Sequence, residues 1–177
     1  MPATYEPIAT YTVSGSAVAL YTFSSIPQTY TDLILYSSVQ GQANGCAPTI
    51  NLNGVTTGSL YSVTILYTDG LTTWSGARGA NINNFDIGTT SGLPYANTNQ
   101  YAPVIAHFMD YTNTSINKTI FYSYYNATGG YVGGADISYA AGLFRSTSAI
   151  TSITVSVNNS KTVPVGCTYT LYGIKAA

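Results

Sequence analysis

The chain has 177 residues, of which only five are Lys or Arg and six are Asp or Glu, and its formal net charge is −1. This length suits one domain with a sizeable core. The scarcity of basic residues leaves no stripe that could neutralise phosphates, which argues against nucleic-acid binding. No apolar run approaches the ~20 residues of a membrane helix, and no targeting segment is visible at the amino terminus. We therefore expect the chain to be made and folded in the cytoplasm and to have no membrane partner.

Short runs rich in Val, Ile, Thr, Tyr and Phe follow one another along the chain, separated by clusters of Gly, Pro, Asn and Asp. No stretch shows the 3.6-residue apolar period of an amphipathic helix. The pattern predicts a single all-β domain over residues 1–177, an antiparallel β-sandwich of jelly-roll type. It predicts about ten strands, at residues 17–24, 32–39, 49–53, 60–67, 81–87, 103–111, 119–125, 136–144, 150–157 and 168–174, with a further short strand near 9–13.

Two predicted strands, 32–39 and 119–125, are apolar on both faces. The predicted strand at 150–157 differs from them, because it alternates cleanly between apolar and polar residues. In an all-β protein, a strand that is apolar on both faces is either covered by a long loop or buried in an interface, and the sequence leaves both explanations open. Tyr is favoured at protein contacts. The residues that we expect at an interface are Ile34 and Tyr36 in the first strand, and Tyr122 and Tyr124 in the second.

The segment 71–100 fits the strand pattern least well, and we expect a long, partly irregular excursion there. It contains the only Trp of the chain, Trp74, together with Arg78. Aromatic rings beside amide side chains can stack on and hydrogen-bond to sugars. An alternative function is therefore a glycan-contact loop, and the other possibility is that Trp74 anchors its loop on the sandwich. The candidate residues are Trp74, Arg78, Asn83, Asn84 and Asn97.

The sequence offers little that resembles a catalytic site. The only histidine, His107, lies on the opposite strand face from Asp110, so no His–Asp pair is implied and a half-buried structural imidazole is expected. Cys46 and Cys167 are interpreted as two buried thiols, because a reducing cytoplasm disfavours the alternative disulfide. The acidic residues are scattered, and no glycine-rich loop precedes a helix. We predict that the chain is not an enzyme and has no metal or cofactor.

Arg145 follows a predicted strand and is one of only five cations. With so few charges in the chain, a fixed role is an attractive interpretation: a carboxylate partner within the fold or across a subunit contact. The alternative is a solvated arginine at a strand end. We place Arg145 among the expected interface residues.

Six segments of the sequence, taken together, point to a family of proteins: YEPIAT at 5–10, FSSIPQTYTDL at 23–33, LNG at 52–54, GARG at 76–79, GLFRSTSAITSI at 142–153 and YTLYGIK at 169–175. They resemble a family of small virion structural proteins of tailed bacteriophages, frequent in phages of cyanobacteria and other aquatic bacteria. The resemblance spans nearly the whole chain. At the position of Phe144 the family often has Trp, and its early strands hold more charge than those of this chain.

The resemblance implies a non-enzymatic virion component, and within the virion we favour a capsid decoration (cement) protein at the capsid surface. Such a protein would bind the major capsid protein as a small homo-oligomer, which we expect to be a trimer. The alternatives are a receptor- or glycan-binding module of a tail or head fibre, and another tail or baseplate component.

Overall fold

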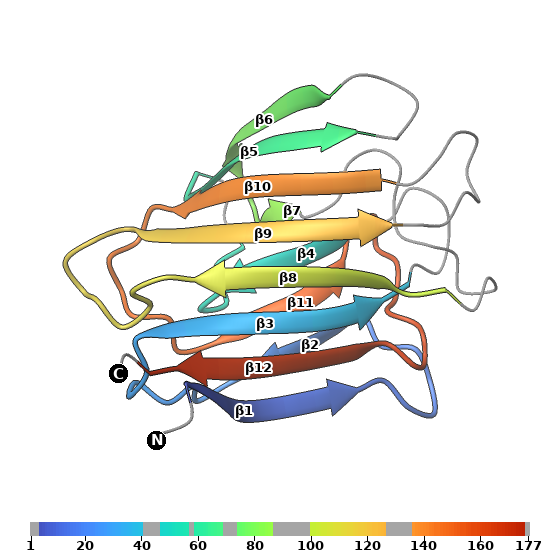
Figure 1. The fold of residues 1–177 in the computed structure, drawn as a ribbon, viewed down its shortest axis with the longest axis horizontal. Helices are drawn as coiled ribbons and strands as arrows, with labels where there is room; N and C mark the ends of the chain where they lie inside the picture. Colours follow the sequence, from blue (N-terminus) through green and yellow to red (C-terminus); the bar gives the residue numbers. More distant parts are fainter. Residues whose placement is uncertain are drawn as a thin grey trace.

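The structure, a computed structural model, describes residues 4–40, 47–56, 59–68, 74–86, 100–126 and 136–175. In these residues all regular structure is β-strand, and every strand pairing is antiparallel. The twelve strands form two sheets, and Figure 1 shows the smaller sheet behind the larger one. The predicted all-β class is confirmed for the described residues, with more strands than the ten expected.

The larger sheet has eight strands in the spatial order β1 (Tyr5–Thr12), β12 (Thr168–Ile174), β3 (Asp32–Val39), β8 (Ala102–Phe108), β9 (Lys118–Asn126), β10 (Asp136–Phe144), β5 (Tyr61–Thr68) and β6 (Ser75–Ile82). The smaller sheet has four, in the order β2 (Leu20–Phe23), β11 (Ile153–Val157), β4 (Pro48–Leu52) and β7 (Phe85–Asp86). Only one face of the larger sheet, called here the inner face, therefore has a second layer of strands against it (Figure 1).

The core lies between the two sheets and follows the two-residue period of the strands. In β3, Leu33 and Leu35 point inward and are fully buried. Ile153 and Val155 of β11, in the smaller sheet, are buried as well and belong to the same core cluster. The clean alternation of β11, with buried and half-buried residues in turn, confirms the one-sided pattern expected from its sequence.

Polar and steric details fix how the sheets meet near β5 and β7. The buried hydroxyl of Tyr61 accepts a hydrogen bond from the Leu52 backbone nitrogen at 2.9 Å and donates one to the Val55 carbonyl at 2.9 Å. The ring of Phe85 packs edge-on against Tyr61, with centroids 4.9 Å apart, and also lies directly over Gly142 of β10. A Cβ atom at Gly142 would come within 2.5 Å of that ring, so only glycine fits there without movement.

The strand predictions at 32–39, 136–144 and 168–174 match β3, β10 and β12 residue for residue. The predicted strand at 81–87 is wrong, because β6 occupies Ser75–Ile82 and β7 is a separate two-residue strand. The β6 sequence SGARGANI lacks the alternating large apolar residues that signal a strand. It forms one because it pairs along its length with β5 at the edge of the larger sheet.

Candidate functional site

The outer face of the larger sheet has no described strand packed against it. Directly paired residues of antiparallel strands point to the same face, so the pairing register gives the rows of side chains that cross this face. One row runs from Tyr172 of β12 to Arg78 of β6, and comprises Tyr172, Ile34, His107, Phe121, Ala141, Thr64 and Arg78. The next row comprises Thr170, Tyr36, Ile105, Ser123, Tyr139, Leu66 and Gly76.

Large apolar side chains on this face are exposed to solvent. Phe121 is 52% exposed, Tyr139 47%, Leu66 49% and Tyr36 42%. Phe121, Tyr139 and Leu66 line a shallow hollow of about 600 Å³ that extends to His107. Contiguous exposed apolar surface of this kind marks interaction sites more often than it marks inert surface. We call this surface, the outer-facing residues of β1, β12, β3, β8, β9, β10, β5 and β6, the aromatic face.

Two of the three principal glycan candidates lie on the aromatic face. Trp74 immediately precedes β6, is 50% exposed and stacks on Tyr139 with ring centroids 6.3 Å apart. Arg78 lies four residues further along and points to the same face. Asn83 is separate from them: it follows β6, and its backbone carbonyl accepts a hydrogen bond from the Asn51 side chain of β4. Asn97 lies outside the described residues.

Both arginines of the chain line a second hollow on the aromatic face, of about 350 Å³. Arg78 lies on its β6 side and Arg145 lies just beyond the end of β10, with Ser62 and Thr64 of β5 between them. Arg145 donates a hydrogen bond from Nη1 to the Ser59 carbonyl at 2.8 Å, which holds the guanidinium in place. We call this the arginine hollow. Sequence reasoning missed it because the strand order brings the two distant residues together.

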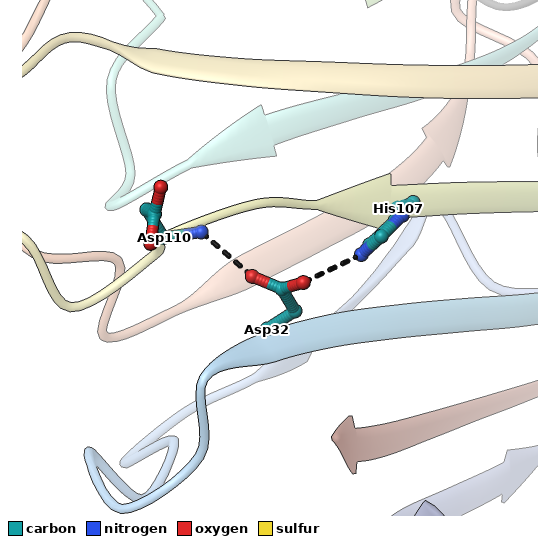
Figure 2. Close-up of polar contacts among 3 residues, drawn as sticks. All are labelled: Asp32, His107 and Asp110. Atoms are coloured by element: carbon teal, nitrogen blue, oxygen red, sulfur yellow. Dashed lines mark hydrogen bonds and ion pairs between the residues drawn. The ribbon is translucent and has the colours of Figure 1, made fainter. Parts of the chain in front are cut away.

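The single histidine has a carboxylate partner that the sequence did not indicate. His107 Nε2 lies 3.1 Å from Oδ2 of Asp32, which begins the neighbouring strand β3. The other oxygen of Asp32 accepts a hydrogen bond from the Asp110 backbone nitrogen at 2.8 Å, as Figure 2 shows. The sequence implied no His–Asp pair, because Asp110 lies on the opposite strand face, and it predicted a half-buried histidine. His107 is half-buried, and its acidic partner is Asp32. The partner comes from an adjacent strand through the β3–β8 pairing.

The structure corrects two of the expected interface residues. Tyr122 and Tyr124 of β9 point to the inner face and are 3% and 0% exposed. The Tyr122 hydroxyl donates to the Asp86 carbonyl at 2.9 Å, and burial raises the pKa of Tyr122 well above its usual value. They belong to the core, and the aromatic residues of β9 on the opposite, outer face are Phe121 and Tyr125. Ile34 and Tyr36 do point to the aromatic face, although Ile34 is only 7% exposed.

No cysteine nucleophile approaches the His107–Asp32 pair among the described residues. Cys167 is a buried free thiol whose sulfur accepts a hydrogen bond from the Gln40 backbone nitrogen at 3.4 Å. Gln40 follows the end of β3 while Asp32 begins it, so about 25 Å separate the two groups along the strand. Burial also raises the pKa of the Cys167 thiol. Cys46 lies outside the described residues.

In the part of the chain that the structure describes, no group of three His, Cys, Asp or Glu side chains is placed to hold a metal ion. In the same residues, no helix is long and apolar enough to cross a membrane.

No family model and no curated protein matches the chain. Among solved structures, the chain is similar to a protein of unknown function, SO2946 from Shewanella oneidensis MR-1, with a TM-score of 0.30 and 11% identity over 98% of this chain and 77% of that one. It matches an infectious bursal disease virus structure (Gt strain) with a TM-score of 0.12 and 14% identity, over 96% of this chain and 42% of that one. The resemblance to phage virion proteins stays a prediction.

Proposed function

We propose that this chain is a non-enzymatic virion structural protein, a β-sandwich of jelly-roll connectivity that decorates the outer capsid shell as a small homo-oligomer. Its copies contact one another through the aromatic face. The observation that carries the proposal is the exposure of Tyr36, Leu66, Phe121 and Tyr139 on one face of an eight-stranded sheet. The proposed partners are copies of the chain and the major capsid protein.

The size of the aromatic face supports a stable protein contact. Eight strands spaced ~4.8 Å apart, each about eight residues long at ~3.3 Å per residue, cover roughly 900 Å². Standard protein interfaces bury about 800 Å² on each partner. Most of the face is uncharged, so a second copy meets little like-charge repulsion. The proposed place on the capsid shell rests on the resemblance of the sequence to small phage virion proteins.

The copy number of the chain in purified virions tests the place in the virion. Quantitative mass spectrometry against the major capsid protein is expected to give a simple, high ratio. A few copies per particle would instead place the chain in the tail or fibres and would overturn capsid decoration. Absence of the chain from purified particles would overturn the virion proposal as a whole.

A second candidate function is glycan binding by a fibre module, and the stacking of Trp74 on Tyr139 favours it. Exposed aromatic rings beside a guanidinium resemble the combination of stacking and polar groups that sugars need. If this function holds, Trp74→Ala abolishes binding on a glycan array, while Leu20→Ser, a change at an exposed residue of β2 in the smaller sheet, leaves it intact. Unaltered binding by the Trp74 variant, or no binding by the unmodified chain, would remove this candidate.

A further inference from the structure

We propose that two copies of the chain pack aromatic face to aromatic face about a twofold axis parallel to β9, with Asp32 of each copy in the arginine hollow of the other. The inference rests on the proposed self-association and names its geometry and its ionic contacts. Three features of the aromatic face support it: the places of its opposite charges, the residues that a half-turn brings together, and the hydrogen-bonding positions that the charged side chains leave unused.

The aromatic face has opposite charges at two separate positions. Asp32 begins β3, and the arginine hollow lies over β5, between Arg78 and Arg145. Three strands, β8, β9 and β10, lie between β3 and β5, so the two positions are about 19 Å apart across the sheet. Along the strands they are level. The register places Thr119, Leu143, Ser62 and Ala80 in one row, and extending the β3–β8 and β8–β9 pairings by one residue brings Asp32 into that row.

β9 is the middle strand of these five, two strands from β3 and two from β5. A half-turn about an axis parallel to β9, between two facing sheets, puts β3 of one copy over β5 of its partner and leaves positions along the strands unchanged. The strands of the two copies run in the same direction, which is the aligned packing that twisted sheets adopt. Each Asp32 therefore meets the partner's arginine hollow, and the contact forms twice, as an isologous interface requires.

The same operation brings complementary side chains together. Phe121 of β9 lies at the axis and meets its own copy, which suits stacking of exposed rings. Tyr172 of β12 faces Arg78 of the partner's β6, a cation–π arrangement. Elsewhere in the two rows, His107 faces Ala141 and Thr170 faces Gly76. Two pairs of larger apolar side chains also face each other, Tyr36 with Leu66 and Ile105 with Tyr139.

The charged groups retain bonding capacity for the contact. The Asp32 side chain is 22% exposed, and its hydrogen bonds to His107 and the Asp110 backbone use about half of the acceptor positions of a carboxylate. Arg145 donates one Nη1 hydrogen bond to a neutral carbonyl. Among the described residues, neither Arg78 nor Arg145 forms an ion pair with a carboxylate. A carboxylate that enters the arginine hollow would meet two guanidinium groups, the strongest class of charged hydrogen bond.

A charge-exchange experiment tests the geometry. Sedimentation equilibrium of the unmodified chain over the micromolar range is expected to show a monomer–dimer equilibrium. Asp32→Arg and Arg78→Asp are each expected to weaken their own dimer by tenfold or more, because each places like charges at both copies of the contact. In a dimer that contains one copy of each variant, residue 32 of each copy faces residue 78 of the other. The two residues carry opposite charges at both contacts. An equimolar mixture of the two variants is expected to form dimers at concentrations where each variant alone is monomeric.

Controls separate this geometry from misfolding and from failure of the proposed function. Circular dichroism checks that each variant is folded, and Phe121→Ser is expected to weaken the dimer while Leu20→Ser, an exposed residue of β2 in the smaller sheet, leaves it unchanged. If the chain self-associates but the mixture does not recover dimers, the twofold geometry is overturned and the proposed function stands. If the chain forms a trimer, the twofold geometry is likewise overturned and the proposed function stands. A strictly monomeric chain overturns both.

Discussion

At the scale of single residues, the two-residue period of a strand separates the core from the aromatic face. Phe121 is 52% exposed, whereas its neighbour Tyr122 is 3% exposed. The sequence predicted that this strand is apolar on both faces, and this is confirmed. It assigned the wrong side to the interface, because a strand with aromatic residues on both faces has no local signal for which face the second sheet covers.

The contact between Gly142 and Phe85 gives a prediction about stability. Gly142→Ala places a methyl group 2.5 Å from a fully buried ring, and the resulting overpacking is expected to lower the free energy of unfolding by about 1–3 kcal/mol. The matched control is Gly76→Ala in β6, where the nearest atom to the added methyl is a carbonyl oxygen at 3.8 Å. Urea denaturation of both variants measures the difference. Equal stabilities of the two variants would contradict the tight packing at Gly142.

At the scale of elements, the loop between β8 and β9 is held by a buried lysine. Lys118 is 1% exposed, and its ammonium group donates to the carbonyl oxygens of Asn113, Ile116 at 2.8 Å and Thr147 at 3.1 Å. Burial lowers the pKa of Lys118. These bonds join the β8–β9 loop to the segment that follows β10. Sequence reasoning found no role for this residue, because its partners are backbone atoms that only the folded loops bring together.

Replacement of this lysine is therefore expected to be costly. Lys118→Met keeps the length of the side chain but leaves three carbonyl groups without their donor, and we expect a loss of about 2–4 kcal/mol in the free energy of unfolding. Lys161→Met, at a half-exposed position, is the control, with an expected change within about 0.5 kcal/mol. Thermal or urea unfolding provides the measurement. A Lys118 variant as stable as its control would show that water replaces the ammonium group without cost.

At the scale of the whole molecule, the use of tyrosine in place of charged residues predicts an alkaline limit to stability. Among the almost completely buried tyrosines, burial raises the pKa of four: Tyr61, Tyr111, Tyr122 and Tyr169. In the unfolded chain these hydroxyls ionise near pH 10. The unfolded state therefore binds fewer protons than the folded state above that pH, so the stabilisation that is present below pH 10 is lost as the pH rises.

The free energy of unfolding is expected to fall steeply with pH. Each such tyrosine lowers it by about 1.4 kcal/mol for every pH unit above the pKa that the tyrosine has in the unfolded chain. The lowered pKa of Lys118 acts in the opposite direction, because the unfolded lysine holds its proton longer, but it is one group against four. The urea midpoint is expected to be the same at about pH 8 and pH 9, and to fall markedly by about pH 11. An unchanged midpoint at pH 11, with ionisation followed by ultraviolet absorbance, would mean that these hydroxyls titrate in the folded state.

The sequence by itself determined the all-β class, the bounds of β3, β10 and β12, and the scarcity of charge. These properties are local or compositional: alternation, turn residues and residue counts do not depend on how strands are ordered. The edge strand β6 lay beyond that reasoning, because pairing with β5 rather than its own pattern makes it a strand.

Only the tertiary structure decided which strand faces lie in the core and which charged groups share a site. Arg78 and Arg145 meet because β10, β5 and β6 are adjacent in the sheet, and Asp32 meets His107 because β3 pairs with β8. The order of strands results from packing the whole chain into two layers, a non-local balance of burial that no short segment encodes. The candidate site consists of such cross-strand neighbours, so it became visible only with the fold.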